Sequence, residues 1–535
     1  MVNALMNKAL QLHRQGRLDE ADRIYEEVLR IDAANHQALH YSGVVAIQKS
    51  QYQRAVELIR RSIALHPDDP DAYGNLGVAL LNLDRMDEAL SSLDRAIGNK
   101  PDYAEACFNR GLVFLAQHRY EEALENYRRA VSIRPDYAEV LSNQASLLHA
   151  LGRHGEAVEA YRQVLAVKPD DAVTYNDLGV VLQEMNRADE AFASYDRAIE
   201  LQPGNPVIYW NKSVGKLLFG EYEEGWVLNE WRWKVVDALK LEHHSYVQPR
   251  WTGREPLRDK TILLYSEQGL GDTIQFARYI QMVAYLGARI ILGVDPSLVT
   301  LLGQIHGITS LVSKGQKLPR FDYHCPLMSL PRLFRTTVDS IPFSTKYLSS
   351  DPERVDWWRR RLGTKSSPRI GLAWSGNPEL NKDANRSIEL ARLIKSLPDG
   401  FDYYSLQKDL RAHDRATLRQ GGMIRHLGDE LQDFSDTAAL CDLMDLVISV
   451  DTALVHLAGA LGRPVWLLNR FDTCWRWLTD REDSPWYASM KIYRQQKPGD
   501  WDAVLQRVAG DLEERFGRAG RRQRPSSVNL SGGEV

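Results

Sequence analysis

LVISVDTALVHLAGALGRPVWLL, residues 446–468, contains the pattern that decides the fold of the second part of this chain. It predicts a buried strand over 446–450, a helix over 453–461 and a second buried strand over 464–468. Short apolar runs joined through a helix are typical of a β-α-β unit in a parallel sheet. Ligands of such sheets bind where the strands end and the helix N-termini expose backbone N–H groups. The Asp451-Thr452 turn is therefore either part of an anion site or only a helix cap.

Strands and helices alternate from Asp259 onward, which predicts an α/β fold made of two Rossmann-like halves that face each other across a cleft. We expect a first half over 259–350, a hinge over 351–367, a second half over 368–516 and a disordered tail over 517–535. Besides the two strands above, we expect strands over 261–265, 289–294, 310–313, 322–325, 369–374, 402–406, 423–426 and 491–493, and helices over 273–286 and 500–516.

The first 239 residues repeat with a period of 34. Alanine and proline recur at this spacing: Ala21, Ala55, Ala89, Ala123, Ala157 and Ala191, and Pro67, Pro101, Pro135, Pro169 and Pro203. A small residue follows the same step (Ala9, Gly43, Gly77, Gly111, Ala145, Gly179, Ser213), and large tyrosines fill the space between units (Tyr25, Tyr127, Tyr161, Tyr195). This is the tetratricopeptide pattern of paired helices, an all-α superhelix. We count six good repeats over 2–205 and a degenerate seventh over 206–239, followed by a connector over 240–258.

The concave face of such an array binds extended peptides. One position of successive repeats is polar throughout: Asn7, Tyr41, Asn75, Asn109, Asn143, Asp177 and Asn211. A side-chain amide offers a donor and an acceptor to a peptide backbone. We therefore predict that Asn75, Asn109, Asn143, Asp177 and Asn211 bind an extended peptide, although asparagine is common at this position in such repeats generally. Trp226, Trp231 and Trp233 in the seventh repeat are expected to seal the array against the domain that follows.

Composition excludes several classes of protein. Hydrophobic residues make up 44% of the chain, charged residues make up 26%, and the net charge of −4 predicts neither nucleic acid nor an anionic membrane as a partner. The four cysteines lie far apart, without the spacing of a zinc site or a disulfide framework. Without a signal peptide or a long apolar run, the chain is expected to be a soluble cytoplasmic protein with no membrane span.

Candidate site residues follow the expected strands. Gly269-Leu270-Gly271-Asp272 follows the first strand, where Asp272 either faces the cleft or caps a helix; because no GxGxxG is completed, NAD binding is disfavoured. Ser375 and Asn377, then Arg386, and then Gln407 and Lys408 follow strands of the second half. Two cations beside the helix that begins after Thr452 make a phosphate site. The Trp475-Arg476-Trp477 cluster either stacks structurally or lines this pocket.

The second half resembles the donor-binding half of the heptosyltransferase-like glycosyltransferases, which have the GT-B fold. The motif of this family consists of an Asp-Thr turn, a His-Leu-Ala helix and a Leu-Gly-x-Pro ending. This chain has Asp451-Thr452, His456-Leu457-Ala458 and Leu461-Gly462-Arg463-Pro464 at the corresponding places. The Gly-Asp pair of the family corresponds to Gly271-Asp272 in the first half. Joined to repeats, the chain is similar in architecture to O-linked N-acetylglucosamine transferases and bacterial flagellin glycosyltransferases. Ala453, where heptosyltransferases have glycine, and the short first half argue against a heptose donor and a lipopolysaccharide acceptor.

The resemblance implies inverting, metal-independent transfer of a sugar from a nucleotide-sugar donor. It makes Asp272 the catalytic base and assigns donor binding to Ser375, Asn377, Arg386, Gln407, Lys408, Asp451, Thr452, Ala453 and His456, although His456 is equally a packing residue. The expected acceptor is Ser or Thr of a protein held by the repeats, with flagellin as one candidate. The alternatives are a carbohydrate or lipid acceptor, or a catalytically inactive scaffold. The Asp-x-Asp triplets at 69–71 and 500–502 are explained by a repeat turn and a helix cap rather than by metal.

Overall fold

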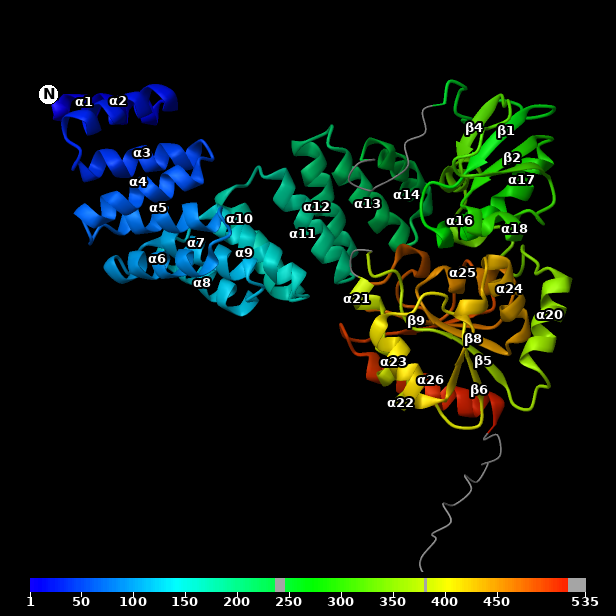
Figure 1. Ribbon diagram of the computed structural model, residues 1–535. Helices are drawn as coiled ribbons and strands as arrows, with labels where there is room; N and C mark the ends of the chain where they lie inside the picture. Colours follow the sequence, from blue (N-terminus) through cyan, green and yellow to red (C-terminus); the bar gives the residue numbers. More distant parts are fainter. Residues whose placement is uncertain (236–245, 380–382, 518–535) are drawn as a thin grey trace, which may run out of the picture. The chain divides into compact units, whose positions relative to one another are not determined.

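The computed structural model describes residues 1–235, 246–379 and 383–517. It contains two compact units, Met1–Leu182 and Gln183–Val535 (Figure 1). The end of the expected seventh repeat (236–239), the first part of the expected connector (240–245) and all but the first residue of the expected tail (518–535) lie outside the described residues. In the part of the chain that the structure describes, no helix is both long and apolar enough to cross a membrane.

The first unit is built from helices that pack in consecutive pairs. They are α1 (Val2–Arg14), α2 (Leu18–Ile31), α3 (His36–Gln48), α4 (Tyr52–Leu65), α5 (Pro70–Leu81), α6 (Met86–Asn99), α7 (Ala104–Ala116), α8 (Tyr120–Ile133), α9 (Ala138–Ala150), α10 (His154–Val167) and α11 (Ala172–Glu184), the last of which continues into the second unit. Close packing explains the recurring small residue. A Cβ on Gly43 would lie 2.5 Å from Cγ1 of Ile59, and one on Gly77 would lie 2.5 Å from Cγ of Leu93.

The second unit opens with the last helices of the repeat pattern. They are α12 (Ala188–Leu201), α13 (Pro206–Leu218) and α14 (Tyr222–Asn229), followed by the 3₁₀ helix η1 (Glu230–Lys234). The aromatic side chains of α14 enter the α/β core: Trp226 is 2% exposed and packs on Phe276, Trp475 and Trp486. The expected seal is thus confirmed for Trp226. Trp231 instead stacks on Tyr209 of α13, with ring centroids 4.0 Å apart.

A four-stranded parallel sheet forms the first α/β half. Its strands are β1 (Thr261–Tyr265), β2 (Arg289–Val294), β3 (Ile308–Ser313) and β4 (Tyr323–Pro326), in the order β3-β2-β1-β4. Its helices are α16 (Leu270–Phe276), α17 (Ile280–Tyr285), α18 (Val299–Leu302) and α19 (Leu330–Leu333), with short 3₁₀ turns η2 (Ala277–Tyr279), η3 (Pro296–Leu298), η4 (Leu327–Ser329) and η5 (Val338–Ser340).

A six-stranded parallel sheet forms the second half, in the order β10-β9-β8-β5-β6-β7. Its strands are β5 (Arg369–Ala373), β6 (Asp402–Ser405), β7 (Ile424–His426), β8 (Leu446–Val450), β9 (Val465–Asn469) and β10 (Met490–Arg494). The helices are α20 (Pro352–Leu362), α21 (Asp383–Arg386), α22 (Leu390–Ser396), α23 (Ala412–Gly421), α24 (Phe434–Leu443), α25 (Ala453–Ala460) and α26 (Trp501–Phe516), with η6 (Gly428–Glu430) and η7 (Trp475–Trp477). The strand order reverses between β5 and β8, which is where doubly wound sheets bind their ligands.

The sequence predictions of strands agree closely with these elements. The predictions over 261–265, 289–294 and 446–450 match β1, β2 and β8 at both ends, and the other predicted strands are displaced by at most two residues. The helix expected from residue 273 begins at Leu270, because Gly269 is its N-cap and Asp272 accepts a hydrogen bond from the Gly269 N–H. The prediction placed the helix start too late because glycine is a weak sequence signal for a cap.

The two halves are joined along α25. The carbonyl oxygen of Ala460 accepts hydrogen bonds from the N–H groups of Tyr347 and Leu348, at 3.0 and 3.1 Å. Gly462 has a φ of +69°, and a Cβ there would lie 2.9 Å from the carbonyl oxygen of Thr345. Only glycine satisfies both conditions without strain. The Leu-Gly-x-Pro motif therefore brings the end of α25 against the segment that leads into α20.

Candidate functional site

Helix α16 of the first half and helix α25 of the second half pack against each other (Figure 1). A Cβ on Gly271 would lie 2.8 Å from Cδ2 of His456 and 3.4 Å from Cα of Ala453. The glycine-rich turn after β1 thus permits the close approach of a helix from the first half to one from the second. As a result, the expected base, Asp272, and the expected phosphate-binding turn lie in a single region.

Both oxygens of Asp272 are engaged. Oδ2 accepts a hydrogen bond of 3.2 Å from the Gly269 N–H, and Oδ1 forms an ion pair with Nη2 of Arg476, a residue of η7. The sequence left the role of Arg476 open, and its pairing with a residue 204 positions away carries no local signal. The structure adds Arg476 to the site as a group that contacts the expected base.

The turn after β8 is closed by short polar contacts. Thr452 is the N-cap of α25, with its Oγ1 accepting a hydrogen bond of 3.4 Å from the Leu454 N–H. The preceding carbonyl oxygen, that of Asp451, accepts a 3.1 Å hydrogen bond from Nη1 of Arg386. Thr452 therefore does cap its helix, and the same turn places the cation of Arg386 beside the start of α25. Capping does not prevent anion binding here. The first turn of a helix has more N–H groups without a partner inside the helix than one capping side chain can satisfy.

Two arginines share one buried carboxylate next to this turn. Asp383 is 4% exposed and accepts from Nε of Arg386 at 2.8 Å, while its other oxygen pairs with Nη2 of Arg411 and accepts from Oγ of Ser387. Gly376 permits the approach, because a Cβ there would lie 2.4 Å from Nη2 of Arg386. Sequence reasoning did not select Arg411. The cluster holds one more cation than carboxylates, which suits an anionic ligand.

Ser375 and Gln407 bind each other at the switch point. The Gln407 amide oxygen accepts from the N–H groups of Trp374 and Ser375, both at 3.2 Å, and its amide nitrogen donates to Oγ of Ser375 at 2.6 Å. Gln407 therefore fixes the loop that leaves β5. Asn377 accepts from the Glu379 N–H, and the exposed Lys408 donates to the carbonyl oxygen of Gln432 at 2.9 Å. The structure thus unites Arg386 with the Thr452 turn and directs Lys408 toward the segment before α24.

His456 is a buried packing residue with one polar contact. The residue is 4% exposed, its Nδ1 lies 2.9 Å from the Tyr487 hydroxyl, and its ring stacks on Trp477 at 5.2 Å. Burial, together with the charges of Arg476 and Arg278, holds the pKa of His456 well below its usual range. Its imidazole is therefore neutral at physiological pH and supports the Gly271 contact.

The predicted peptide-binding residues are half-buried in their repeats. Nδ2 of Asn75 lies 2.9 Å from Nε2 of His40, and Nδ2 of Asn143 donates to the Glu139 carbonyl oxygen of its own helix at 2.9 Å. Burial raises the pKa of Asp177, which accepts from Nδ2 of Asn176 at 3.1 Å. Asn109 lies on α7, and Asn211 lies on α13 in the second unit. The triplets at 69–71 and 500–502 are confirmed as caps, because Asp69 and Asp500 cap α5 and α26.

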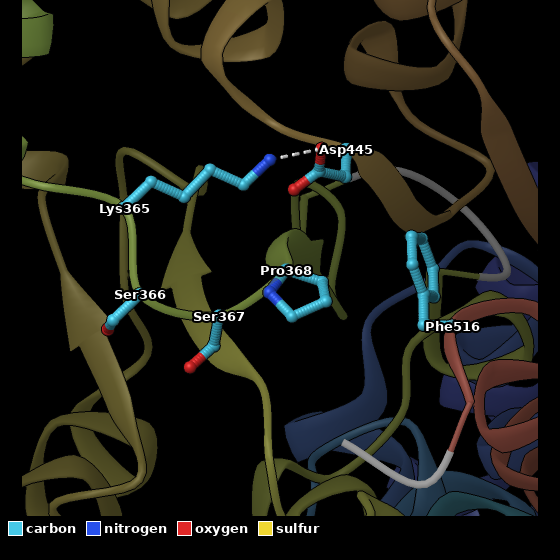
Figure 2. Close-up of a pocket in the computed structure, with 6 residues that line it drawn as sticks. All are labelled: Lys365, Ser366, Ser367, Pro368, Asp445 and Phe516. Atoms are coloured by element: carbon cyan, nitrogen blue, oxygen red, sulfur yellow. Dashed lines mark hydrogen bonds and ion pairs between the residues drawn. The ribbon is translucent and has the colours of Figure 1, made fainter. Parts of the chain in front are cut away.

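A hollow of about 380 Å³ lies at the opposite edge of the six-stranded sheet. Figure 2 shows its lining, where Lys365 and Asp445 form an ion pair across from Phe516 of α26. Lys365 precedes β5 and Asp445 precedes β8, so both lie at the amino ends of these strands. Because ligands of doubly wound sheets bind at the carboxyl ends of the strands, we do not assign the donor site to this hollow.

Comparison with known families agrees with this architecture. Tetratricopeptide repeats match residues 2–35, 42–104, 102–170 and 136–204. Glycosyltransferase family 9 (heptosyltransferase) matches residues 430–468, which include β8, α25 and β9. The chain thus carries tetratricopeptide repeats and a glycosyltransferase domain.

Individual relatives cover parts of the chain. Protein FlbA of Caulobacter vibrioides is 28% identical over 330 residues, which are 56% of this chain and 53% of that relative, so the chain spans about half of its length. Among solved structures, MamA is 26% identical over 32% of this chain and 93% of that chain, with a TM-score of 0.29. PilF of Pseudomonas aeruginosa is 21% identical over 39% of this chain and 96% of that chain, with a TM-score of 0.35.

Proposed function

We propose that this chain, which joins tetratricopeptide repeats to a family 9 glycosyltransferase domain, transfers a sugar from a nucleotide-sugar donor to Ser or Thr of a protein. The proposal rests mainly on the contact between α16 and α25. Because of this contact, Asp272 lies beside the turn formed by Asp451 and Thr452. A carboxylate from one half and an anion-binding helix N-terminus from the other are the two groups that glycosyl transfer from a phosphate requires.

In the transfer step one bond to the anomeric carbon forms, another breaks, and a proton moves to Asp272. Asp272 accepts the proton of the acceptor hydroxyl while that oxygen forms a bond to the anomeric carbon of the donor. The bond from this carbon to the phosphate oxygen breaks, and the electron pair leaves with the phosphate. Arg386 and the first N–H groups of α25 stabilise the negative charge that develops there. Attack from the face opposite the phosphate inverts the anomeric configuration, and no metal ion is needed in this scheme.

The other predicted donor-site residues have supporting roles. Gln407 and Ser375 hold the loop after β5 in place through their mutual hydrogen bonds. Asn377 stabilises the same loop through the Glu379 N–H. Ala453 and His456 supply the surface on which Gly271 packs. The base and the phosphate site are therefore positioned by residues that need not touch the donor.

A protein acceptor is favoured by the repeats. They present amide groups at one position of successive helix pairs, and such groups bind an extended backbone regardless of its sequence. Flagellin is one candidate acceptor.

Incubation of the purified chain with lysate from a strain that lacks it tests the proposal. The lysate is freed of small molecules, and UDP-, GDP-, ADP- and CMP-linked sugars are supplied one at a time. We expect one donor to be consumed and one protein to gain the mass of its sugar, with no gain for Asp272→Asn. Consumption of donor with the gain on a glycan or lipid would move the acceptor to that class. No consumption of any donor would contradict the proposal.

A further inference from the structure

We infer that donor phosphate and the base compete for one guanidinium, that of Arg476, so that Asp272 is masked until the donor binds. This inference rests on the proposed function and deepens it. Each carboxylate oxygen of Asp272 already accepts a hydrogen bond, one from the Gly269 N–H and the other from Arg476. Hydrogen bonds and an ion pair stabilise the charged carboxylate and make it a weaker base. In this state Asp272 is therefore poorly able to accept the proton of an acceptor hydroxyl.

Arg476 is held for this contact by several neighbours. Its Nε donates to Oε1 of Gln275 at 2.8 Å, its Nη1 donates to Sγ of Cys474 at 2.9 Å, and its guanidinium lies 4.3 Å from the ring centroid of Trp475. The side chain of Arg476 is 12% exposed and that of Asp272 is 19% exposed. The pair is therefore largely screened from water but keeps some accessible surface.

Arg476 also interacts with the phosphate-binding turn. Burial opposes its charge, but Asp272, Cys474 and Asp451 outweigh burial and raise the pKa of the guanidinium. Arg476 is thus a permanent cation between a carboxylate of the first half and the turn that opens α25. Arg386 approaches the same turn through the carbonyl oxygen of Asp451. A phosphate seated at this turn would lie within the electrostatic reach of both arginines.

A phosphate is a strong competitor for this guanidinium. It carries more charge than a carboxylate, and its oxygens match the planar fork of arginine. When donor phosphates bind, N–H groups of Arg476 move from Asp272 to phosphate, and the freed carboxylate oxygen becomes available to the acceptor hydroxyl. Arg476 is therefore a positioning residue for Asp272. Because its ion pair with Asp272 must break when the donor binds, that ion pair lowers the affinity for the donor.

Nucleotide binding tests this competition without any acceptor. UDP, GDP, ADP and CMP are titrated calorimetrically into the full chain, and the tightest of them is used for the variants. Asp272→Asn should bind it at least about fivefold more tightly, the lower end of typical coupling between sites. Asparagine still offers an oxygen to the Gly269 N–H, so the helix cap is retained. Arg476→Gln should bind at least about fivefold more weakly, because its side chain cannot pair with phosphate as a guanidinium does.

The double variant separates competition from simple charge repulsion. If Asp272 acts only by repelling phosphate, its removal strengthens binding in the Arg476→Gln background as well. If it acts by holding Arg476, that gain disappears. Asp445→Asn is the matched control, because Asp445 pairs with Lys365 at the other edge of the sheet and its removal should leave affinity unchanged (Figure 2).

Each result has a definite meaning. An Asp272→Asn chain that melts like wild type and binds no tighter, or a gain that persists without Arg476, overturns the inference and leaves the proposed function standing. If none of the four nucleotides binds to the wild-type chain, the proposed donor class fails, and the inference fails with it. Arg476→Lys, which keeps the charge but lacks the fork, should lie between wild type and Arg476→Gln.

Discussion

Trp226 of α14 meets Trp475 of η7 edge to face, with ring centroids 5.3 Å apart and ring planes at 90°. Trp475 in turn lies under the guanidinium of Arg476. The last helix pair of the repeat pattern is therefore a support for the loop that contacts Asp272. Within the second unit, this helix pair belongs to the same hydrophobic core as the α/β halves.

Replacement of Trp226 by alanine should destabilise the second unit strongly. Removal of a buried tryptophan leaves a cavity and typically costs about 3–5 kcal/mol of unfolding free energy. Denaturant unfolding followed by circular dichroism measures the loss. Trp357→Ala is the control, because Trp357 is 47% exposed and should cost less than about 1 kcal/mol. Equal costs for the two variants would contradict the assigned packing.

Gly271→Ala should separate α16 from α25. The new Cβ would lie 2.8 Å from Cδ2 of His456, a buried ring that has little room to move, so we expect a loss of about 1–3 kcal/mol in stability. Transfer activity should fall by about tenfold or more, because Asp272 shifts away from the Thr452 turn. Gly293→Ala in β2 is the matched control, since its nearest neighbour would be at 3.6 Å. Wild-type activity in Gly271→Ala would show that this close approach is not needed.

His456 should make the second unit less stable in acid. Its folded pKa lies well below the ordinary value of 6.5, so below that pH the unfolded chain binds a proton that the folded chain does not. The unfolding free energy should therefore fall by up to about 1.4 kcal/mol per pH unit as the pH drops from 6.5 toward 5. Comparison with His456→Gln isolates this contribution from that of other groups. Parallel pH curves for the two proteins would refute it.

The asparagine positions should matter for the acceptor and not for the donor. Asn109→Ala combined with Asn143→Ala removes two amides that are proposed to bind the peptide backbone, so kcat/KM for a protein acceptor should fall by about tenfold. Hydrolysis of the donor by water should be unchanged. Asn99→Ala, at an exposed position of α6, is the control. An unchanged kcat/KM would remove these residues from the acceptor site.

Local patterns made the fold predictable. The alternation of apolar runs and helices located β1, β2 and β8 at their observed ends, and the 34-residue period located the helix pairs. The period also placed Tyr25 and Tyr127 inside, where both are fully buried. These signals are strong because each repeats along the chain or is confined to one short segment.

The contacts of the site were less predictable because they join distant segments. The sequence selected Asp272 and Arg386, since each follows a strand, but it did not indicate that Arg476 pairs with the first or that Arg411 shares Asp383 with the second. The direction of Lys408 toward Gln432 depends on the loop after β6. Such contacts depend on how distant segments pack within the second half or, for Arg476 and Asp272, between the two halves, and no local pattern encodes that packing.

Intact-mass spectrometry of cellular proteins tests the central claim most directly. It compares a strain that carries Asp272→Asn at the native locus with its wild-type parent, at equal levels of the chain. We predict that at least one protein is lighter in the variant by the mass of one or more sugar residues. Identical masses for all proteins, with the variant folded and expressed, would contradict the assignment of this chain as a protein glycosyltransferase that uses Asp272 as its base.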